Sequence, residues 1–228
     1  MTPDLPTVEI AIVKQTNIFR RQNALNAVRR NRLLDLAARR FAQYLARTGK
    51  FSHTADGRKP AERISATGYE YCRISENLAL RGDSRGFKAR VLAKSSVEGW
   101  KKSPGHRRNM MEPSVTEIGV GVAKAPGKHQ YLSVQLFGRP RALRYTFEIR
   151  NTTQQRVGYS FAGRQRTVPA RVVLKTTACE PGKLQFSRSV GLAAQPNRAA
   201  RFTTGRGDRF ILSVRNGKIV VSRRRGRD

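Results

Sequence analysis

The sequence predicts an α+β protein in two parts, a set of helices around a small antiparallel sheet followed by a small all-β domain. Apolar residues repeat at helical spacing in three long segments before about residue 105. Two alternating segments joined by Pro126-Gly127-Lys128 then predict a β-hairpin. After Pro140 the helical period disappears, and short β-rich runs recur between turn residues. The expected parts are 8–140 for the mixed domain, 141–222 for a sandwich-like β-rich domain and 223–228 for a disordered basic tail.

The mixed domain is expected to contain three long helices and one short helix. The long helices are predicted over residues 8–25, 32–48 and 87–102. Gly49 ends the second of them, and Ser103-Pro104-Gly105 breaks the third before His106 opens a last turn. The short helix is predicted over 59–66, with Pro60 in its first turn.

Strands are predicted from alternation and from β-rich runs between turns. In the first domain they cover 71–80, 118–122 and 132–136. In the second they cover 145–149, 157–161, 170–176, 183–186, 209–214 and 218–221. Asn216-Gly217 between two such runs is a strong signal for a two-residue hairpin.

The charge of the chain is its most unusual property. It has 46 Lys and Arg residues against 15 Asp and Glu, a net charge of +31. Residues 1–140 contribute 26 basic and 11 acidic side chains, and residues 141–228 contribute 20 and 4. Such a surface attracts polyanions, namely nucleic acid, anionic lipid or acidic cell-wall polymer. A general bias of the proteome or an adaptation to an acidic medium is the alternative explanation.

The compartment is left open by the sequence. No apolar run approaches the roughly 18–20 residues of a transmembrane helix. The first residues, Met1-Thr2-Pro3-Asp4, do not have the basic start and apolar stretch of a signal peptide. The chain is therefore either cytosolic or the mature form of an exported protein.

The two cysteines, Cys72 and Cys179, allow one disulfide, and no CxxC spacing indicates a metal or redox motif. A bridge would close a loop of 107 residues. In the chain-entropy description such a loop stabilises the fold by roughly 4–5 kcal/mol. Two buried free thiols are the alternative.

Six short motifs occur in an order that resembles a known family. They are Asn17-x-x-Arg20, Phe51-Ser52-His53, Ser75-Glu76-Asn77-Leu78-Ala79, Trp100-x-x-Ser103-Pro104-Gly105-His106-Arg107-x-Asn109, Glu117-x-Gly119-Val120-Gly121-Val122 and Gln135-Leu136-Phe137-Gly138. The series resembles the bacterial branch of the CAP superfamily (cysteine-rich secretory proteins, antigen 5, pathogenesis-related 1). The part after Pro140 is similar to a β-rich extension of some proteobacterial members.

The resemblance implies a three-layer α/β/α sandwich and a cleft that holds two histidines. Carried over position by position, His53 and His106 match the cleft histidines, and Glu76 matches their acidic partner. Asn77 is expected to bond backbone beside the cleft. Ser103 stands where many eukaryotic members have a second glutamate, so the usual four-residue set is reduced to three. The family is typically exported, which favours a secreted or periplasmic mature protein and an oxidised cysteine pair.

Three functions are compatible with these features. Two imidazoles and a carboxylate can hold a zinc ion with a position left for water, so His53, Glu76 and His106 are candidate metal ligands in a zinc-dependent hydrolase. A binding module for a lipid, glycan or acidic polymer of the cell envelope is the first hypothesis, because most similar proteins have no established catalysis. Alternatively, the same three residues have a structural role only and hold loops against helices through hydrogen bonds.

Nucleic-acid binding is the least favoured function, because no recognition motif is present and aromatic residues make up only 7% of the chain.

Overall fold

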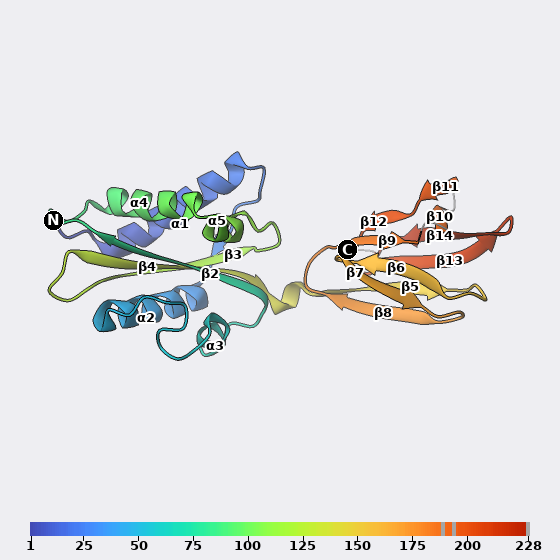
Figure 1. The fold of residues 1–228 in the computed structure, drawn as a ribbon, viewed down its shortest axis with the longest axis horizontal. Helices are drawn as coiled ribbons and strands as arrows, with labels where there is room; N and C mark the ends of the chain where they lie inside the picture. The colour runs from blue at the N-terminus through green and yellow to red at the C-terminus, as the bar shows by residue number, and fades with distance from the viewer. Residues whose placement is uncertain (188–189, 193–194, 227–228) are drawn as a thin grey trace. The chain divides into compact units, whose positions relative to one another are not determined.

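The computed structural model describes residues 1–187, 190–192 and 195–226 (Figure 1). The chain divides into two compact units, Met1–Ala142 and Leu143–Asp228. The boundary lies two residues beyond Pro140, after which the sequence changes its pattern. The predicted α+β class is confirmed. Among the described residues, helices occur only in the first unit, apart from the short 3₁₀ turn Arg141–Leu143 at the boundary.

The first unit is built on a four-stranded sheet of order β1-β3-β4-β2. Its strands are β1 (Arg29–Arg30), β2 (Tyr71–Gly82), β3 (Glu117–Lys124) and β4 (Gln130–Pro140). Strand β4 pairs antiparallel with both β2 and β3, whereas β1 pairs parallel with β3. Strand β1 was not predicted, because two residues are too few to show alternation. Strand β2 is an edge strand, which matters for the site described below.

Helices cover both faces of this sheet, so the predicted three-layer arrangement is confirmed (Figure 1). One layer contains α1 (Leu5–Gln22), α4 (Ala89–Lys102) and α5 (Pro104–Met111), and the other contains α2 (Arg32–Thr48) and α3 (Pro60–Ser65). Helix α1 begins three residues earlier than predicted because the Asp4 carboxylate accepts a hydrogen bond from the Thr7 N–H and caps the helix. Helix α5 has eight residues, where the sequence predicted a single turn.

An apolar core lies on each face of the sheet. Trp100 belongs to the core beneath α1 and α4, and Phe41 belongs to the core beneath α2. Helix α2 lies directly on β3. The contact is so close that a Cβ atom added at Gly119 or Gly121 would collide with the helix backbone. The two glycines are therefore explained by close packing between a helix and a strand.

The second unit is an all-β sandwich of two sheets. Their orders are β11-β10-β14-β13-β5-β8 and β12-β9-β6-β7. The strands are β5 (Tyr145–Asn151), β6 (Val157–Phe161), β7 (Arg164–Val168), β8 (Val173–Ala178), β9 (Lys183–Phe186), β10 (Val190–Leu192), β11 (Gln195–Ala199), β12 (Arg201–Thr203), β13 (Arg209–Arg215) and β14 (Lys218–Arg224). Aromatic rings from both sheets meet in the core. The ring centres of Phe147 in β5 and Phe161 in β6 are 4.9 Å apart.

Two sequence predictions for this unit were incomplete or wrong. Strands β7, β10, β11 and β12 were not predicted, because they are short or carry charged residues in place of an apolar alternation. The predicted disordered tail 223–228 begins too early, since β14 continues to Arg224 and pairs with β13. The Arg223 guanidinium also donates to both carboxylate oxygens of buried Asp208, at 2.7 and 3.1 Å. Residues 227–228 lie outside the described residues.

The two cysteines form a disulfide. Both Cys72 and Cys179 are bonded, and no free cysteine remains among the described residues. The sequence-based alternative of two free thiols is therefore wrong, and the predicted pairing is confirmed.

Candidate functional site

The site is built on the free edge of strand β2. The backbone carbonyl of Glu76 accepts a hydrogen bond from Asn109 Nδ2 at 3.1 Å, and that of Leu78 accepts one from Trp100 Nε1 at 2.9 Å. These side chains satisfy carbonyl groups that an edge strand leaves unpaired. Helices α4 and α5 are thereby fixed against the edge that carries Glu76 and Asn77.

The Glu76 carboxylate is buried and held by an arginine. Its side chain is 2% exposed, and Arg63 Nη2 donates to its two oxygens at 2.9 and 3.1 Å. Arg63 Nη1 donates to Asp56 Oδ1 at 2.8 Å, and the Arg63 guanidinium lies 3.5 Å above the ring centre of Phe41. One buried cation therefore bridges two carboxylates, which offsets much of the cost of removing them from water.

The same arginine fixes the loop between α2 and α3. Arg63 donates to the backbone oxygen of His53 at 2.9 Å and to that of Arg58 at 2.7 Å. Because Arg63 sits on the short helix α3, these bonds tie the loop from His53 to Arg58 to the face of β2. Two contacts therefore position His53: its backbone carbonyl is held by Arg63, and its ring is held by the contact described next.

His53 contacts Glu76 directly. Its Nδ1 atom lies 2.7 Å from Glu76 Oε1. An ionised carboxylate can only accept a hydrogen bond, so Nδ1 carries the proton and Nε2 is the acceptor in the neutral ring. The His53 side chain is 52% exposed, and within the described residues Nε2 has no hydrogen-bond partner. The ring is thus oriented by Glu76 and presents Nε2 to a ligand.

Asn77 faces the opposite side of the sheet from Glu76, as successive residues of a strand do. Its Nδ2 atom donates to Gln135 Oε1 at 2.9 Å and to the backbone oxygen of His106 at 3.2 Å. Its Oδ1 atom accepts from Asn109 Nδ2 at 2.9 Å. Gln135 in turn donates to Thr16 Oγ1 at 2.9 Å. This buried chain of polar groups joins α5, β2, β4 and α1, and it holds the beginning of α5.

His106 is half-buried in the first turn of α5. Burial is the main cause that lowers the pKa of its imidazole below the ordinary 6.5, and repulsion from Arg81, and from His53 when that ring is protonated, lowers the pKa further. The ring is therefore neutral at pH 7. The two imidazoles come from opposite layers, and among the described residues no hydrogen bond joins them. A single cleft that encloses both rings stays a prediction.

Ser103 has a structural position at the junction of two helices. Its N–H donates to the Gly99 carbonyl at 3.2 Å and ends α4, while its carbonyl accepts from the Arg107 N–H at 2.8 Å and begins α5. In the described part of the chain its hydroxyl makes no hydrogen bond to the predicted site residues. Ser103 therefore positions His106 through the backbone.

The candidate metal set does not fit a three-ligand zinc site. The Glu76 oxygens are already engaged by Arg63 and by His53. Among residues 1–187, 190–192 and 195–226, no group of three or more His, Cys, Asp and Glu side chains is arranged to hold a metal ion. A carboxylate neutralised by a buried guanidinium is a poor additional ligand.

Sequence reasoning missed Arg63, which is the centre of this arrangement. It is one of 46 basic residues, and nothing in its local pattern separates it from the exposed ones. Asn109 stood in a motif that the resemblance rested on, but its bonds to Glu76 and Asn77 were not foreseen. Gln135 and Thr16 were likewise not expected to connect with Asn77.

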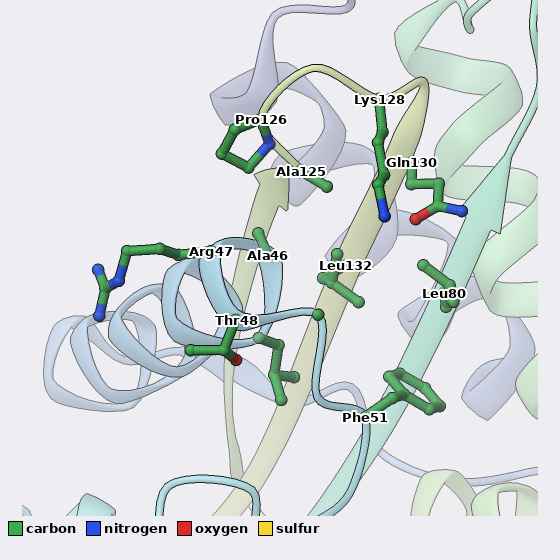
Figure 2. A pocket seen from close by; sticks show the side chains of 12 residues that line it. Ala46, Arg47, Thr48, Phe51, Leu80, Ala125, Pro126, Lys128, Gln130 and Leu132 are labelled. Carbon is green, nitrogen blue, oxygen red and sulfur yellow. The ribbon is translucent and has the colours of Figure 1, made fainter.

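Helix α2 lines several pockets, and two of them also include residues of the loop between α2 and α3. Figure 2 shows the first, of about 210 Å³, between the end of α2 and the β3–β4 hairpin. Apolar side chains such as Leu45, Leu80 and Leu132 line it. In Figure 2 Lys128 extends toward Leu132, whereas the side chain of Arg47 points away. The second, of about 350 Å³, lies between α2, α3 and the loop before α3. We call this second one the arginine pocket; its lining residues are Ala37, Arg40, Phe41, Tyr44, Arg47, Asp56, Arg58, Arg63 and Ala66.

Comparison with known families identifies the first unit. The profile described as "Cysteine-rich secretory protein family", or CAP, matches residues 13–137, more than half of the chain. The chain belongs to this family. The CAP match lies within the first unit and includes His53, Glu76 and His106.

One curated relative is the uncharacterised protein YkwD of Bacillus subtilis (strain 168). It is 27% identical over 118 residues, which make up 51% of this chain and 43% of YkwD. The CAP chain therefore spans less than half the length of that relative.

Solved structures resemble the CAP unit in fold. An outer surface protein from Borrelia burgdorferi matches with a TM-score of 0.50 and 22% identity, over 57% of this chain and 90% of that one. An extracellular protein containing a SCP domain from Bacillus anthracis matches with a TM-score of 0.49 and 22% identity, over 59% of this chain and 41% of that one. No helix in the described part of this CAP protein has the length and apolar character needed to cross a membrane.

Proposed function

We propose that this CAP protein is a secreted or periplasmic binding module for an anionic ligand of the cell envelope or the extracellular medium. The observation that carries the proposal is the fixed state of Glu76 between Arg63 and His53. A general base needs a carboxylate oxygen that can reach a substrate proton. Glu76 is instead buried and neutralised, so it serves to hold His53 in one orientation, as a binding site requires.

The charge of the protein supports an anionic ligand. With 46 basic and 15 acidic residues, the surface field attracts negative groups at long range. Membership of a family described as secretory supports a location outside the cytoplasm. An acidic polymer, glycan or lipid of the envelope would then be the nearest partner of suitable charge.

The test is sedimentation with two anionic probes, phosphatidylglycerol vesicles and a polygalacturonate resin, with phosphatidylcholine vesicles and uncharged agarose as controls. We expect binding to at least one anionic probe at low salt, and release at about 0.5 M salt, where the Debye length is only a few ångströms. Equal binding to the neutral controls, or binding that salt leaves unchanged, would contradict the proposal. His53→Ala should weaken this binding if the site contributes to it.

A zinc-dependent hydrolase in which the two imidazoles and water, without Glu76, would hold the ion is the second candidate. What supports it is the orientation of His53 by a carboxylate, which leaves Nε2 exposed, together with the neutral ring of His106. Carboxylate–histidine pairs of this kind commonly orient metal-binding imidazoles. Calorimetric titration of the wild type and His53→Ala with zinc tests this candidate. If the wild type takes up no zinc at micromolar concentration, this candidate is removed and the binding proposal is unaffected.

A further inference from the structure

The arginine pocket contains more positive charge than the surrounding protein neutralises. Arg40, Arg47 and Arg58 are exposed, and none of them forms an ion pair with a carboxylate among the described residues. The one acidic residue that lines the pocket, Asp56, is already bonded to Arg63 at 2.8 Å. Three arginines without a carboxylate partner therefore line one cavity of about 350 Å³ and remain available to a ligand.

The geometry of α2 spaces two of these arginines along one helix face. Arg40 and Arg47 are seven residues apart, so their Cα atoms lie on the same side of α2 about 10 Å apart along the axis. Tyr44 lies between them on that face, and Arg47 stands 5.9 Å from the centre of its ring. Arg58 enters the same cavity from the loop before α3.

We propose that the arginine pocket binds a linear anionic polymer, with successive phosphate or carboxylate groups seated on Arg40, Arg47 and Arg58. This inference rests on the proposed function and names its ligand class and its place. Guanidinium groups bind both kinds of anion through paired N–H donors. A single monovalent anion would leave two of the three guanidinium groups without a counter-charge, whereas a chain of anionic groups can neutralise all three.

Arg63 links this pocket to the His53–Glu76 contact. It donates to the Arg58 carbonyl and to Asp56 on the pocket side, and to Glu76 and the His53 carbonyl on the β2 side. Arg63 is therefore a positioning residue that holds the Arg58 backbone in place. The pocket of Figure 2 shares only Arg47 with the arginine pocket, and its apolar lining offers less to a chain of charges.

The experiment measures binding of the full chain to medium-chain polyphosphate and to oligogalacturonate, with inorganic phosphate and a single-stranded oligonucleotide as comparison ligands. The pocket variant is Arg40→Gln/Arg47→Gln/Arg58→Gln. The matched control is Arg21→Gln/Arg90→Gln/Arg108→Gln, which removes three exposed arginines that have no ion pair among the described residues and line none of the pockets described above. Both variants lose the same charge.

We expect the pocket variant to lose affinity for at least one polymer by about thirtyfold or more, and the control by less than about threefold, because only long-range attraction is weakened there. The salt dependence of binding should flatten in the pocket variant only, since fewer ions are released. Inorganic phosphate should bind far more weakly than the polymers. The polymer that responds identifies whether phosphate or carboxylate groups are the natural chemistry.

A second readout does not depend on variants. Phenylglyoxal modifies accessible arginines, and mass mapping should show that polymer protects Arg40, Arg47 and Arg58 but leaves Arg21 and Arg90 reactive. Equal loss of affinity in both variants, together with equal protection, would overturn the pocket and leave the general anion-binding proposal standing. If the oligonucleotide alone responded to the pocket variant, the ligand class would be wrong. If the wild type bound no anionic probe, the proposed function itself would fail.

Discussion

The two units differ in what they bury. Among the described residues, the CAP unit buries six charged side chains, whereas the β-rich unit buries one, Asp208. The six are Glu9, Arg20, Asp35, Arg63, Glu76 and Glu117. The β-rich unit is instead filled with aromatic rings, of which Phe147 touches both Phe161 and Phe210.

This difference shows where each unit carries specificity. Four of these buried charges join a helix to a strand of the sheet, namely Glu9, Asp35, Arg63 and Glu76, and all six are hydrogen-bonded. Glu9, for example, accepts from both Arg30 and Arg39 and so joins α1 to α2. Such ion pairs fix the positions of helices and strands relative to each other. If one partner moved away, the other would be left as an unpaired charge in the protein interior, which is energetically costly. The aromatic interior of the β-rich unit stabilises through area and shape, which positions no chemical group at the surface.

The largest expected effect comes from Arg63→Met. It removes the partner of buried Glu76 and should lower the free energy of unfolding of the CAP unit by about 3–5 kcal/mol. Hydrogen exchange resolved by peptide should quicken in β2, α2 and α3 and stay unchanged in β5–β14. Comparable quickening across the aromatic core would mean that the two interiors are not separate. The exposed Arg108→Met is the control, and it should change stability by less than about 0.5 kcal/mol.

A double substitution sharpens this prediction. If the cost of Arg63→Met comes from an unpaired Glu76 charge, then Arg63→Met/Glu76→Leu should recover part of the lost stability. The recovery would be incomplete because Asp56 and the His53 carbonyl also lose a donor. A double variant less stable than Arg63→Met would contradict the argument from charge.

A smaller effect is expected from Phe147→Leu in the β-rich unit. The change keeps an apolar side chain but removes ring contacts with Phe161 and Phe210, so we expect a loss of about 1–2 kcal/mol. Exchange should quicken in β5, β6 and β13 and not in β2. The loss should not vary with pH between about 5 and 8, because no titratable group is involved. A strong pH dependence would show that ionic groups matter in this core as well.

The smallest effect is the pH dependence from His106. Its folded pKa lies below the ordinary 6.5, so in that range the unfolded chain takes up a proton more readily than the folded one. The free energy of unfolding is therefore not lowered by this group above about pH 6.5, and it decreases as the pH drops below that value. Urea unfolding in the presence of a chelator, at pH 5 and pH 7.5, should show a smaller drop in His106→Gln than in the wild type. An equal drop in both would contradict the pKa shift of His106.

The sequence predicted the elements better than their connections. The bounds of α2 were predicted to the residue, and the structure shows a local cause at each end. Asn31 accepts from the Leu33 N–H, and Gly49, the predicted stop, adopts a left-handed conformation. Strand β1 and strands β10–β12 were missed because they are short or carry no apolar alternation. The basic tail was misjudged because Arg223 is ordered by Asp208, a residue of a different segment.

The sequence by itself determined the two-part organisation, the family resemblance of residues 8–140 and the identity of His53, Glu76 and His106 as candidate site residues. These rest on periodicity and on motif order, which are properties of neighbouring residues. Only the tertiary structure decided that Arg63 holds Glu76 and His53, and that Arg40, Arg47 and Arg58 share one pocket. The physical reason is that a guanidinium acquires its role from the groups packed around it, and those groups come from segments that meet only in the folded chain.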